Sequence, residues 1–151
     1  MARRAHFRLE LKRKLEQRRY ESEEIEEELE RLAADGYLDD AGTAEIYLAG
    51  RLRRGGLGPR RLIAELRERG LDDEAAAAAV WAQIDDESEL AKDAAERWRR
   101  GRSAPRATAA SLARHLERAG FHSHVVAERV RAFARPPAGG EAGFDEDEEF
   151  G

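Results

Sequence analysis

The sequence predicts an all-helical protein built from three tandem helical repeats, the last one shortened to two helices. Three observations support this fold class. No stretch alternates apolar and polar residues as a half-buried strand does. A pattern of leucines, turn residues and capping residues recurs at offsets of 51 and 50 residues. Charged residues make up 39% of the 151 residues and hydrophobic residues 41%, a composition that suits a shape with much surface per residue.

The recurring element is a pair of helices. Its first helix has two leucines four residues apart in each copy, which places them on one helix face: Leu11 and Leu15, Leu62 and Leu66, Leu112 and Leu116. The turn after this helix holds Arg19, Gly70 and Gly120 in the three copies. Glycine suits the left-handed conformation that often ends a helix, so Arg19 either bears strain there or ends its helix in a different way.

The second helix of each copy is marked by a start signal and an apolar stripe. An apolar residue follows the turn (Tyr20, Leu71, Phe121), and two positions later comes a residue that we expect to be the N-cap (Ser22, Asp73, Ser123). The apolar stripe then consists of Ile25 and Leu29, Ala76 and Val80, Val126 and Val130. The turn and the stripe agree at both offsets, which favours a true repeat over a chance likeness of amphipathic helices.

A third helix follows the first two copies, and each begins at a pair of aspartates, Asp39-Asp40 and Asp85-Asp86. Pro59 and Pro105 are expected to open the helices that come next. The expected helices span residues 6–18, 22–34, 40–54, 59–69, 73–84, 86–101, 106–119 and 123–134. We expect one helical domain over residues 1–135, with repeats at 6–54, 59–101 and 106–135.

The segment 136–151 differs from the rest of the chain. It holds six acidic residues and no lysine or arginine, so a formal net charge of −5 for the whole chain leaves the preceding part near neutral. Its glycine, proline and acid content predicts a disordered tail. Such a tail either folds back onto basic residues as an internal competitor for anionic partners or serves only as a solubilising end.

Several functional classes are excluded or disfavoured by residue content. The chain has no cysteine, which rules out disulfides, cysteine-ligated zinc and thiol catalysis. The basic N-terminus lacks the apolar segment of a secretory signal, and no run of apolar residues is long enough to span a membrane, so we expect a cytoplasmic protein. His122 and His124 lack a third metal ligand, and residues 55–59 lack the Lys-Ser/Thr of a phosphate-binding loop. We therefore expect no metal, no cofactor and no enzymatic activity.

Arginine is concentrated in two stretches. Only three of the 27 basic residues are lysines. The contact candidates are Arg51, Arg53, Arg54, Arg60, Arg61 and Arg67 in the first stretch, beside Arg69, and Arg97, Arg99, Arg100, Arg102 and Arg106 in the second. Guanidinium groups pair bidentately with carboxylate or phosphate, so a regular basic ledge would suit a nucleoprotein surface. Alternatively, they solvate helix faces in local pairs, such as Glu65 with Arg61 or Arg69.

Two further groups of residues have a structural and a functional interpretation. Trp81, Trp98, Tyr37 and Tyr47 are expected in the core, with stacking on bases as the alternative. The glutamates of residues 23–30 favour the dipole at the start of their helix, with contact to a basic partner surface as the alternative.

The stretch from Tyr37 to Leu71 resembles the bacterial RecX family. Its acidic pair at a helix start is followed by Ala44-Glu-Ile-Tyr47, a basic run from Arg51, the junction Gly58-Pro59-Arg60-Arg61, and a helix end Leu66-Arg-Glu-Arg-Gly70. Residues 116–121, Leu-Glu-Arg-Ala-Gly-Phe, are similar to the third repeat of the family. The likeness covers about residues 8–134. Gly42-Thr43, where bulkier residues are expected, and the acidic tail depart from the family pattern.

The resemblance implies a curved, elongated monomer that binds in the groove of the RecA filament on single-stranded DNA, with weak direct DNA contact besides. It implies inhibition of RecA ATP hydrolysis, strand exchange and coprotease activity, and so regulation of homologous recombination, DNA repair and the SOS response. Two alternatives stay open: a helical DNA-binding module that acts without RecA, and a non-catalytic scaffold for another protein.

Overall fold

The computed structural model describes residues 6–135, and the expected disordered tail at 136–151 lies outside this part. The described chain is all-helical, as predicted, with eight α-helices and one short 3₁₀ helix. In chain order they are α1 (Arg8–Gln17), α2 (Ser22–Ala34), α3 (Asp40–Arg54), α4 (Pro59–Glu68), α5 (Asp73–Gln83), α6 (Glu87–Arg100), η1 (Ala104–Arg106), α7 (Ala109–Ala119) and α8 (Ser123–Ala134).

The helix starts differ from expectation in two ways. Pro59 opens α4 as predicted, whereas Pro105 lies in η1, and α7 begins later, with the Thr108 side chain accepting from the Ser111 N–H at 3.1 Å. The expected N-caps Ser22, Asp73 and Ser123 are the first helical residues, and Glu21, Asp72 and His122 are the caps. At Asp72 the reason is direct, because its carboxylate accepts from the Ala75 N–H at 2.7 Å.

The turns between paired helices confirm the repeat. Arg19, Gly70 and Gly120 all have left-handed backbone, with φ of 65°, 107° and 99°. Arg19 is the one residue other than glycine in the described chain with a positive φ, so it bears strain and does not end its helix in a different way. Three aligned positions thus share one local geometry although only two of them are glycine.

The helices pack in groups that are offset by one helix from the expected repeats. One core joins Ala44 and Leu48 of α3 to Leu62 and Leu66 of α4 and to α5. A second joins α6, α7 and α8. A third, smaller core contains Ile25, Leu29 and Leu38 and belongs to α1, α2 and the loop after α2. We call these groups the first unit (α1–α2), the middle unit (α3–α5) and the last unit (α6–α8).

The offset arises because the apolar side of each third helix faces the helix pair that follows it. Ala91, Ala94 and Trp98 of α6 lie in the core of the last unit and not in that of the middle unit. The repeat period is therefore as predicted, but the boundaries 6–54, 59–101 and 106–135 do not coincide with the packed units. The unit with only two helices was predicted at the end of the chain, but among the packed units it is the first one.

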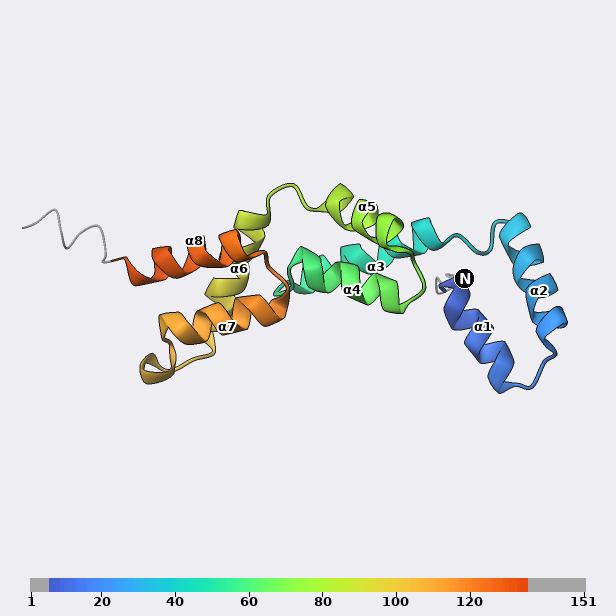
Figure 1. The fold of residues 1–151 in the computed structure, drawn as a ribbon, viewed down its shortest axis with the longest axis horizontal. Coiled ribbons are helices and arrows are strands. Elements are labelled where there is room, and N and C mark those ends of the chain that lie inside the picture. Colours follow the sequence, from blue (N-terminus) through green and yellow to red (C-terminus); the bar gives the residue numbers. More distant parts are fainter. Residues whose placement is uncertain (1–5, 136–151) are drawn as a thin grey trace, which may run out of the picture.

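The units follow one another along the long axis of an elongated molecule (Figure 1). At both joints, residues at the start of one helix pair contact the turn between the helices of the next pair. At the first joint, Leu9 lies against Gly70, and Phe7 is buried in the core of the middle unit. At the second joint, the Gly58 N–H donates to the Ala119 carbonyl at 2.8 Å and the Arg60 N–H to the Gly120 carbonyl at 2.9 Å.

The aromatic residues divide between core and surface. Trp98 is 6% exposed and Tyr47 packs against the core of the middle unit, as predicted. The core prediction is wrong for Trp81 and Tyr37, which are 43% and 61% exposed. Trp81 stacks beside His122, with ring centroids 6.1 Å apart, and so lies against the last unit. None of the helices between residues 6 and 135 has the length and apolar character that a membrane crossing requires.

Candidate functional site

The connection between α3 and α4 brings the first arginine stretch together. Helix α3 ends at Arg54 because Gly55 and Gly56 take φ values of 75° and 90°, which a helix cannot continue. Four residues later Pro59 begins α4 with its preset backbone angle. The last turn of α3 and the first turn of α4 therefore present their basic residues on either side of a short glycine-rich loop.

Between these two helices lies a groove of about 540 Å³, which we call the arginine groove. It is lined by Tyr47, Arg51, Arg54, Arg61, Ala64, Glu65, Glu68 and Arg69. Four arginines thus face two glutamates. A guanidinium in such a groove can pair with an anionic group when it is not already compensated.

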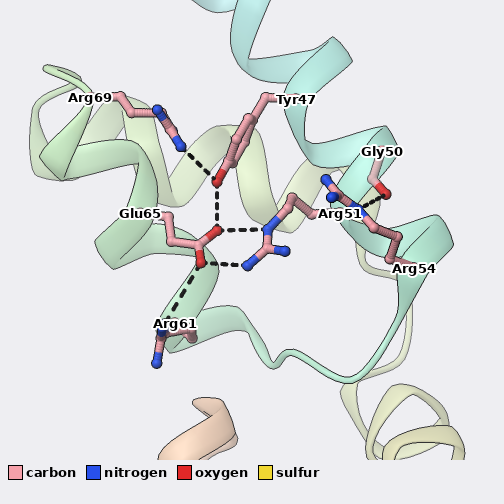
Figure 2. A network of polar contacts seen from close by, with 7 residues as sticks. All are labelled: Tyr47, Gly50, Arg51, Arg54, Arg61, Glu65 and Arg69. Carbon is pink, nitrogen blue, oxygen red and sulfur yellow. Dashed lines mark hydrogen bonds and ion pairs between the residues drawn. The ribbon is translucent and has the colours of Figure 1, made fainter.

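Glu65 lies at the centre of the arginine groove (Figure 2). Its two carboxylate oxygens accept from the Arg51 side chain at 2.6 and 2.9 Å, which is a bidentate pair. The Tyr47 hydroxyl donates to the same carboxylate at 2.7 Å, and Arg61 Nε lies 3.6 Å from it. The network ties α3 to α4 through side chains.

Burial by itself favours the neutral carboxyl of Glu65. The hydrogen bonds from Arg51 and Tyr47, together with the positive charges of Arg51 and Arg61, outweigh burial and hold the pKa of Glu65 below its ordinary value. In turn, the hydrogen bond to Glu65 raises the pKa of Arg51, against the opposing effect of burial. Both groups are therefore firmly charged at neutral pH, and Arg51 is already compensated within the protein.

Arg69 lies against Tyr47. It is one of the two local partners that the sequence offers Glu65, but its guanidinium lies over the Tyr47 ring at 4.5 Å, and Nη2 donates to the Tyr47 hydroxyl at 3.4 Å. Its Nε is buried and has no hydrogen-bond partner in the described chain. The local pairing of Glu65 with Arg61 is present, with the geometry given above.

The second joint runs beside the arginine groove. Arg97 of α6 donates from Nη1 to the Arg54 carbonyl at 2.9 Å, and its Nε donates to Asp93 at 2.8 Å. A Cβ on Gly58 would lie 2.7 Å from the Gly120 carbonyl, and one on Gly120 would lie 2.3 Å from the Arg61 nitrogen. The backbones approach so closely that both positions require glycine.

The candidate arginines of the first stretch fall into two sets. Arg51 and Arg61 pair with Glu65 in the arginine groove, and Arg67 pairs outside it with Asp73 at 2.5 Å. Arg53, Arg54 and Arg60 are exposed, and none of them has an acidic partner in the described chain. The uncompensated charge of this region therefore lies on Arg53, Arg54 and Arg60.

The second stretch lies around the connection between α6 and α7 and has a different environment. Arg99 lies over the Phe133 ring at 5.3 Å, and Arg102 over the Trp98 ring at 5.4 Å. Arg100 and Arg106 are exposed, with no acidic partner among residues 6–135. Burial, with help from the charges of Arg102 and Arg118, lowers the pKa of the neighbouring His115. Here two arginines are stabilised by aromatic rings, whereas in the middle unit the arginines of the groove are stabilised by a carboxylate.

Sequence reasoning found the arginines of the groove but missed Tyr47 as a hydrogen-bond donor and Glu65 as the centre of the network. Tyr47 and Arg51 are four residues apart on one helix, which was the available signal for a shared face. Of the histidine pair, His122 places Nδ1 2.9 Å from Glu87, and the His124 ring lies 6.1 Å from the His122 ring between centroids. In the described part of the chain no three His, Cys, Asp or Glu residues are grouped to hold a metal ion.

Short helical units in tandem, with an arginine-lined groove beside the joint of two of them, place the protein in the class of helical-repeat proteins. Residues 39–80, which begin at the N-cap of α3, match the family described as "RecX, second three-helix domain". Regulatory protein RecX of Halorhodospira halophila is 38% identical over 157 aligned positions, which cover 100% of this chain and 87% of that protein. The chain therefore belongs to the RecX family of regulatory proteins.

One further relative is similar in sequence, and one solved structure is similar in fold. Regulatory protein RecX of Pseudomonas putida is 50% identical over 72 positions, which cover 47% of this chain and 49% of that protein. The crystal structure of RecX from Lactobacillus salivarius shares the fold, with a TM-score of 0.70 over 84% of each chain at 22% identity.

Proposed function

We propose that this protein binds in the groove of the RecA filament on single-stranded DNA and inhibits RecA ATP hydrolysis, strand exchange and coprotease activity. It would thereby regulate homologous recombination and the SOS response, as a monomer in the cytoplasm and without chemistry of its own. Membership of the RecX family supports the partner, and the elongated array of units supports binding along a filament. We further propose that residues 1–135 act as one domain.

The observation that carries the proposal is the uncompensated charge around the arginine groove. Arg53, Arg54 and Arg60 are exposed and lack an acidic partner in the described chain. A nucleoprotein filament displays carboxylates and phosphates, and guanidinium pairs with both. Arg51 and Arg61, already bound to Glu65, have a more structural role, because releasing them would leave a half-buried carboxylate unpaired.

The test is the ATPase activity of the cognate RecA on single-stranded DNA, with this protein added. We expect the wild type to lower ATP hydrolysis and the triple variant Arg53→Glu, Arg54→Glu and Arg60→Glu to lose most of this effect, with an apparent affinity reduced at least about a hundredfold. Loss of about 1 kcal/mol for each reversed contact gives that order of magnitude. The second stretch is tested in parallel by Arg99→Glu, Arg100→Glu and Arg106→Glu.

The matched control reverses three other exposed arginines, Arg13, Arg18 and Arg131, which gives the same change of net charge. We expect the control to inhibit nearly as well as the wild type, and circular dichroism to show that all variants stay folded. Full inhibition by the triple variant would refute the exposed arginines in and beside the arginine groove as the contact region. Tight duplex binding without RecA, together with no effect on its ATPase, would favour a DNA-binding module instead.

A chain that ends at Arg135 tests whether residues 1–135 inhibit RecA on their own and whether residues 136–151 affect that inhibition. If residues 136–151 compete internally for the basic region, the shorter chain inhibits RecA at lower concentration than the full chain. If they are only a solubilising end, both chains inhibit equally.

A further inference from the structure

The last unit has a small groove of its own between α6 and α8. It has a volume of about 160 Å³ and is lined by Lys92, Ala95, Glu96, Arg99, Leu112, Arg129, Ala132 and Phe133. Pockets for drug-sized molecules usually measure about 300–1,000 Å³. The groove is therefore better matched to a side chain of a peptide than to a small-molecule ligand. We call it the α6–α8 groove.

Three basic residues line the α6–α8 groove, against the single acid Glu96. Lys92 and Arg99 are exposed and have no acidic partner in the described chain. Arg129 is 19% exposed, and its one ionic contact in that part of the chain is with Glu128, at 3.6 Å. Its Nε is buried there without a hydrogen-bond partner. Because a guanidinium has five N–H donors, Arg129 retains donors for a further carboxylate.

The floor of the α6–α8 groove is apolar and aromatic. Leu112 is 1% exposed, and Phe133 packs against the same core with its ring edge-on to Trp98, 6.1 Å away between centroids. The Arg99 guanidinium lies over the Phe133 ring at 5.3 Å. An occupant that matches this groove combines an apolar or aromatic side chain with negative charge.

The basic lining is particular to the last unit. When the N-caps of corresponding helices are aligned, the three bases correspond to Glu45, Leu52 and Ala79 of the middle unit. Phe133 corresponds to Gln83, whose side chain donates to the Glu45 carbonyl at 2.9 Å. In the middle unit a side chain thus bridges α3 and α5 at this place, and none of the three positions is basic.

The same chain contains a segment with the matching chemistry. Residues 144–150, which lie outside the described part, read Phe-Asp-Glu-Asp-Glu-Glu-Phe, so five consecutive acids stand between two phenylalanines. Residue 144 follows Arg135 by nine positions, and Arg135 follows Phe133 of the groove by two. Nine residues span up to about 30 Å, whereas α6, with 14 residues, is about 21 Å long. The segment can therefore reach the whole groove.

We propose that residues 144–150 dock in the α6–α8 groove of their own chain, with a phenylalanine ring on the apolar floor and carboxylates paired with Lys92, Arg99 and Arg129. The short covalent connection gives the segment an effective concentration on the order of 1 mM, which favours it over a free partner of equal affinity. Arg99 belongs to the second arginine stretch, so docking withdraws it from other anionic partners. The contact requires no RecA, and its test is independent of the proposed function.

The test compares two full-length chains, the wild type and a released variant in which the acidic run is neutralised. The released variant carries Asp145→Asn, Glu146→Gln, Asp147→Asn, Glu148→Gln and Glu149→Gln. A fluorescent peptide of residues 141–151 is titrated with each chain at about 0.15 M salt, and anisotropy reports binding. We expect a Kd on the order of 100 μM for the released variant. In the wild type, where the chain's own segment competes, we expect binding about tenfold weaker.

Substitutions in the released variant locate the binding site. Lys92→Glu with Arg99→Glu is expected to raise the Kd of the peptide at least about tenfold. The matched control is Arg114→Glu with Arg131→Glu, two exposed arginines that each follow a lining residue by two positions and so lie on the opposite side of their helix. The control is expected to raise the Kd less than about twofold, because salt screens distant charges.

Two further measurements sharpen the assignment. A peptide with Phe144→Ser and Phe150→Ser is expected to lose most of its binding, because the apolar floor then has no occupant. Without peptide, the amide NMR spectra of the wild type and the released variant are expected to differ around the α6–α8 groove and to agree in α1 to α5. Circular dichroism checks that every variant stays folded.

Four results would overturn the proposal. The first is equal binding of the peptide by the wild type and the released variant, or no saturable binding up to about 1 mM. The second is equal loss in the groove variant and in its control, because the attraction would then depend on net charge alone. The third is unchanged binding of the peptide without phenylalanines. The fourth is a wild-type dimer that the released variant does not form, because the segment of a second copy would then occupy the groove.

Discussion

The connection from α3 to α4 and the connection from α6 to α7 occupy the same place in their units, yet they differ in every contact. The first is packed against the next unit through backbone hydrogen bonds at Gly58 and Arg60. The second is followed by no further unit in residues 6–135, and a Cβ on Gly101 would lie 3.9 Å from the nearest atom, the Trp98 carbonyl oxygen. The same motif is thus a joint when a neighbour follows it and an open loop when none does.

The charges around the two connections differ accordingly. Glu65 compensates the arginines at the joint, whereas Arg99 and Arg102 at the open connection lie over aromatic rings. A half-buried carboxylate needs its partners, so Arg51 and Arg61 are held by Glu65 and are less free to bind another anion. Cations over rings keep their polar edges available to a partner.

Substitution of one glycine from each connection tests the packing difference and has the largest expected effect. Gly58→Ala places a Cβ 2.7 Å from the Gly120 carbonyl at an ordinary φ of −96°, so we expect a loss of about 3 kcal/mol of unfolding free energy. Gly101→Ala meets open space at ordinary backbone angles and is expected to change stability by less than about 0.5 kcal/mol. Urea denaturation measures both. Equal stability of the two variants would contradict the assignment of a tight joint.

Removal of the Glu65 carboxylate, beside the first connection, has the next largest effect, and the exposed Asp93 of α6 serves as the reference. Glu65→Gln leaves the half-buried Arg51 without its charged partner, and we expect a loss of about 2 kcal/mol at pH 7. Asp93→Asn breaks an exposed pair with Arg97 and is expected to cost less than about 1 kcal/mol.

The pH dependence of the Glu65 variant has a defined sign. The pKa of Glu65 lies below its ordinary value of 4.5, so the folded protein binds this proton less readily than the unfolded chain does. Its contribution to stability is present at neutral pH and is lost as the pH falls below 4.5. The difference between wild type and Glu65→Gln should therefore shrink on acidification, and a constant difference would contradict the network.

The smallest expected effect is a pH slope that belongs to the open connection. The pKa of His115 lies below its ordinary value of 6.5 because of burial and the charges of Arg102 and Arg118. Stability from this group is therefore present above pH 6.5 and falls as the pH drops below it. Thermal denaturation between about pH 7.5 and 5.5 should show this slope in the wild type and a flatter one in His115→Gln. Arg102→Gln should flatten it in part; an unchanged slope in His115→Gln would assign it to other groups.

Periodicity along the chain was sufficient to predict eight helices and their turns, because leucine spacing and left-handed turn residues are local properties. It could not predict which helix pair α3 and α6 pack against, because an apolar stripe on a helix does not show whether the preceding or the following pair covers it. The same limit applies to Tyr47 and Glu65, whose meeting depends on how α3 lies against α4. Local pairing rules gave Glu65 either Arg61 or Arg69 as a partner. Arg61 pairs with it, whereas Arg69 lies over the Tyr47 ring.

Phe7 has a consequence for the mechanics of the molecule. Its ring is buried in the core of the middle unit, although it directly precedes α1, and the next residue donates its N–H to Asp40 at 2.8 Å. The chain leaves the first unit through the loop before α3, so this unit is fastened to its neighbour at both of its ends. Two attachments restrict rotation of the α1–α2 pair relative to the middle unit. A force applied to α1 and α2 would therefore be transmitted to the core of the middle unit.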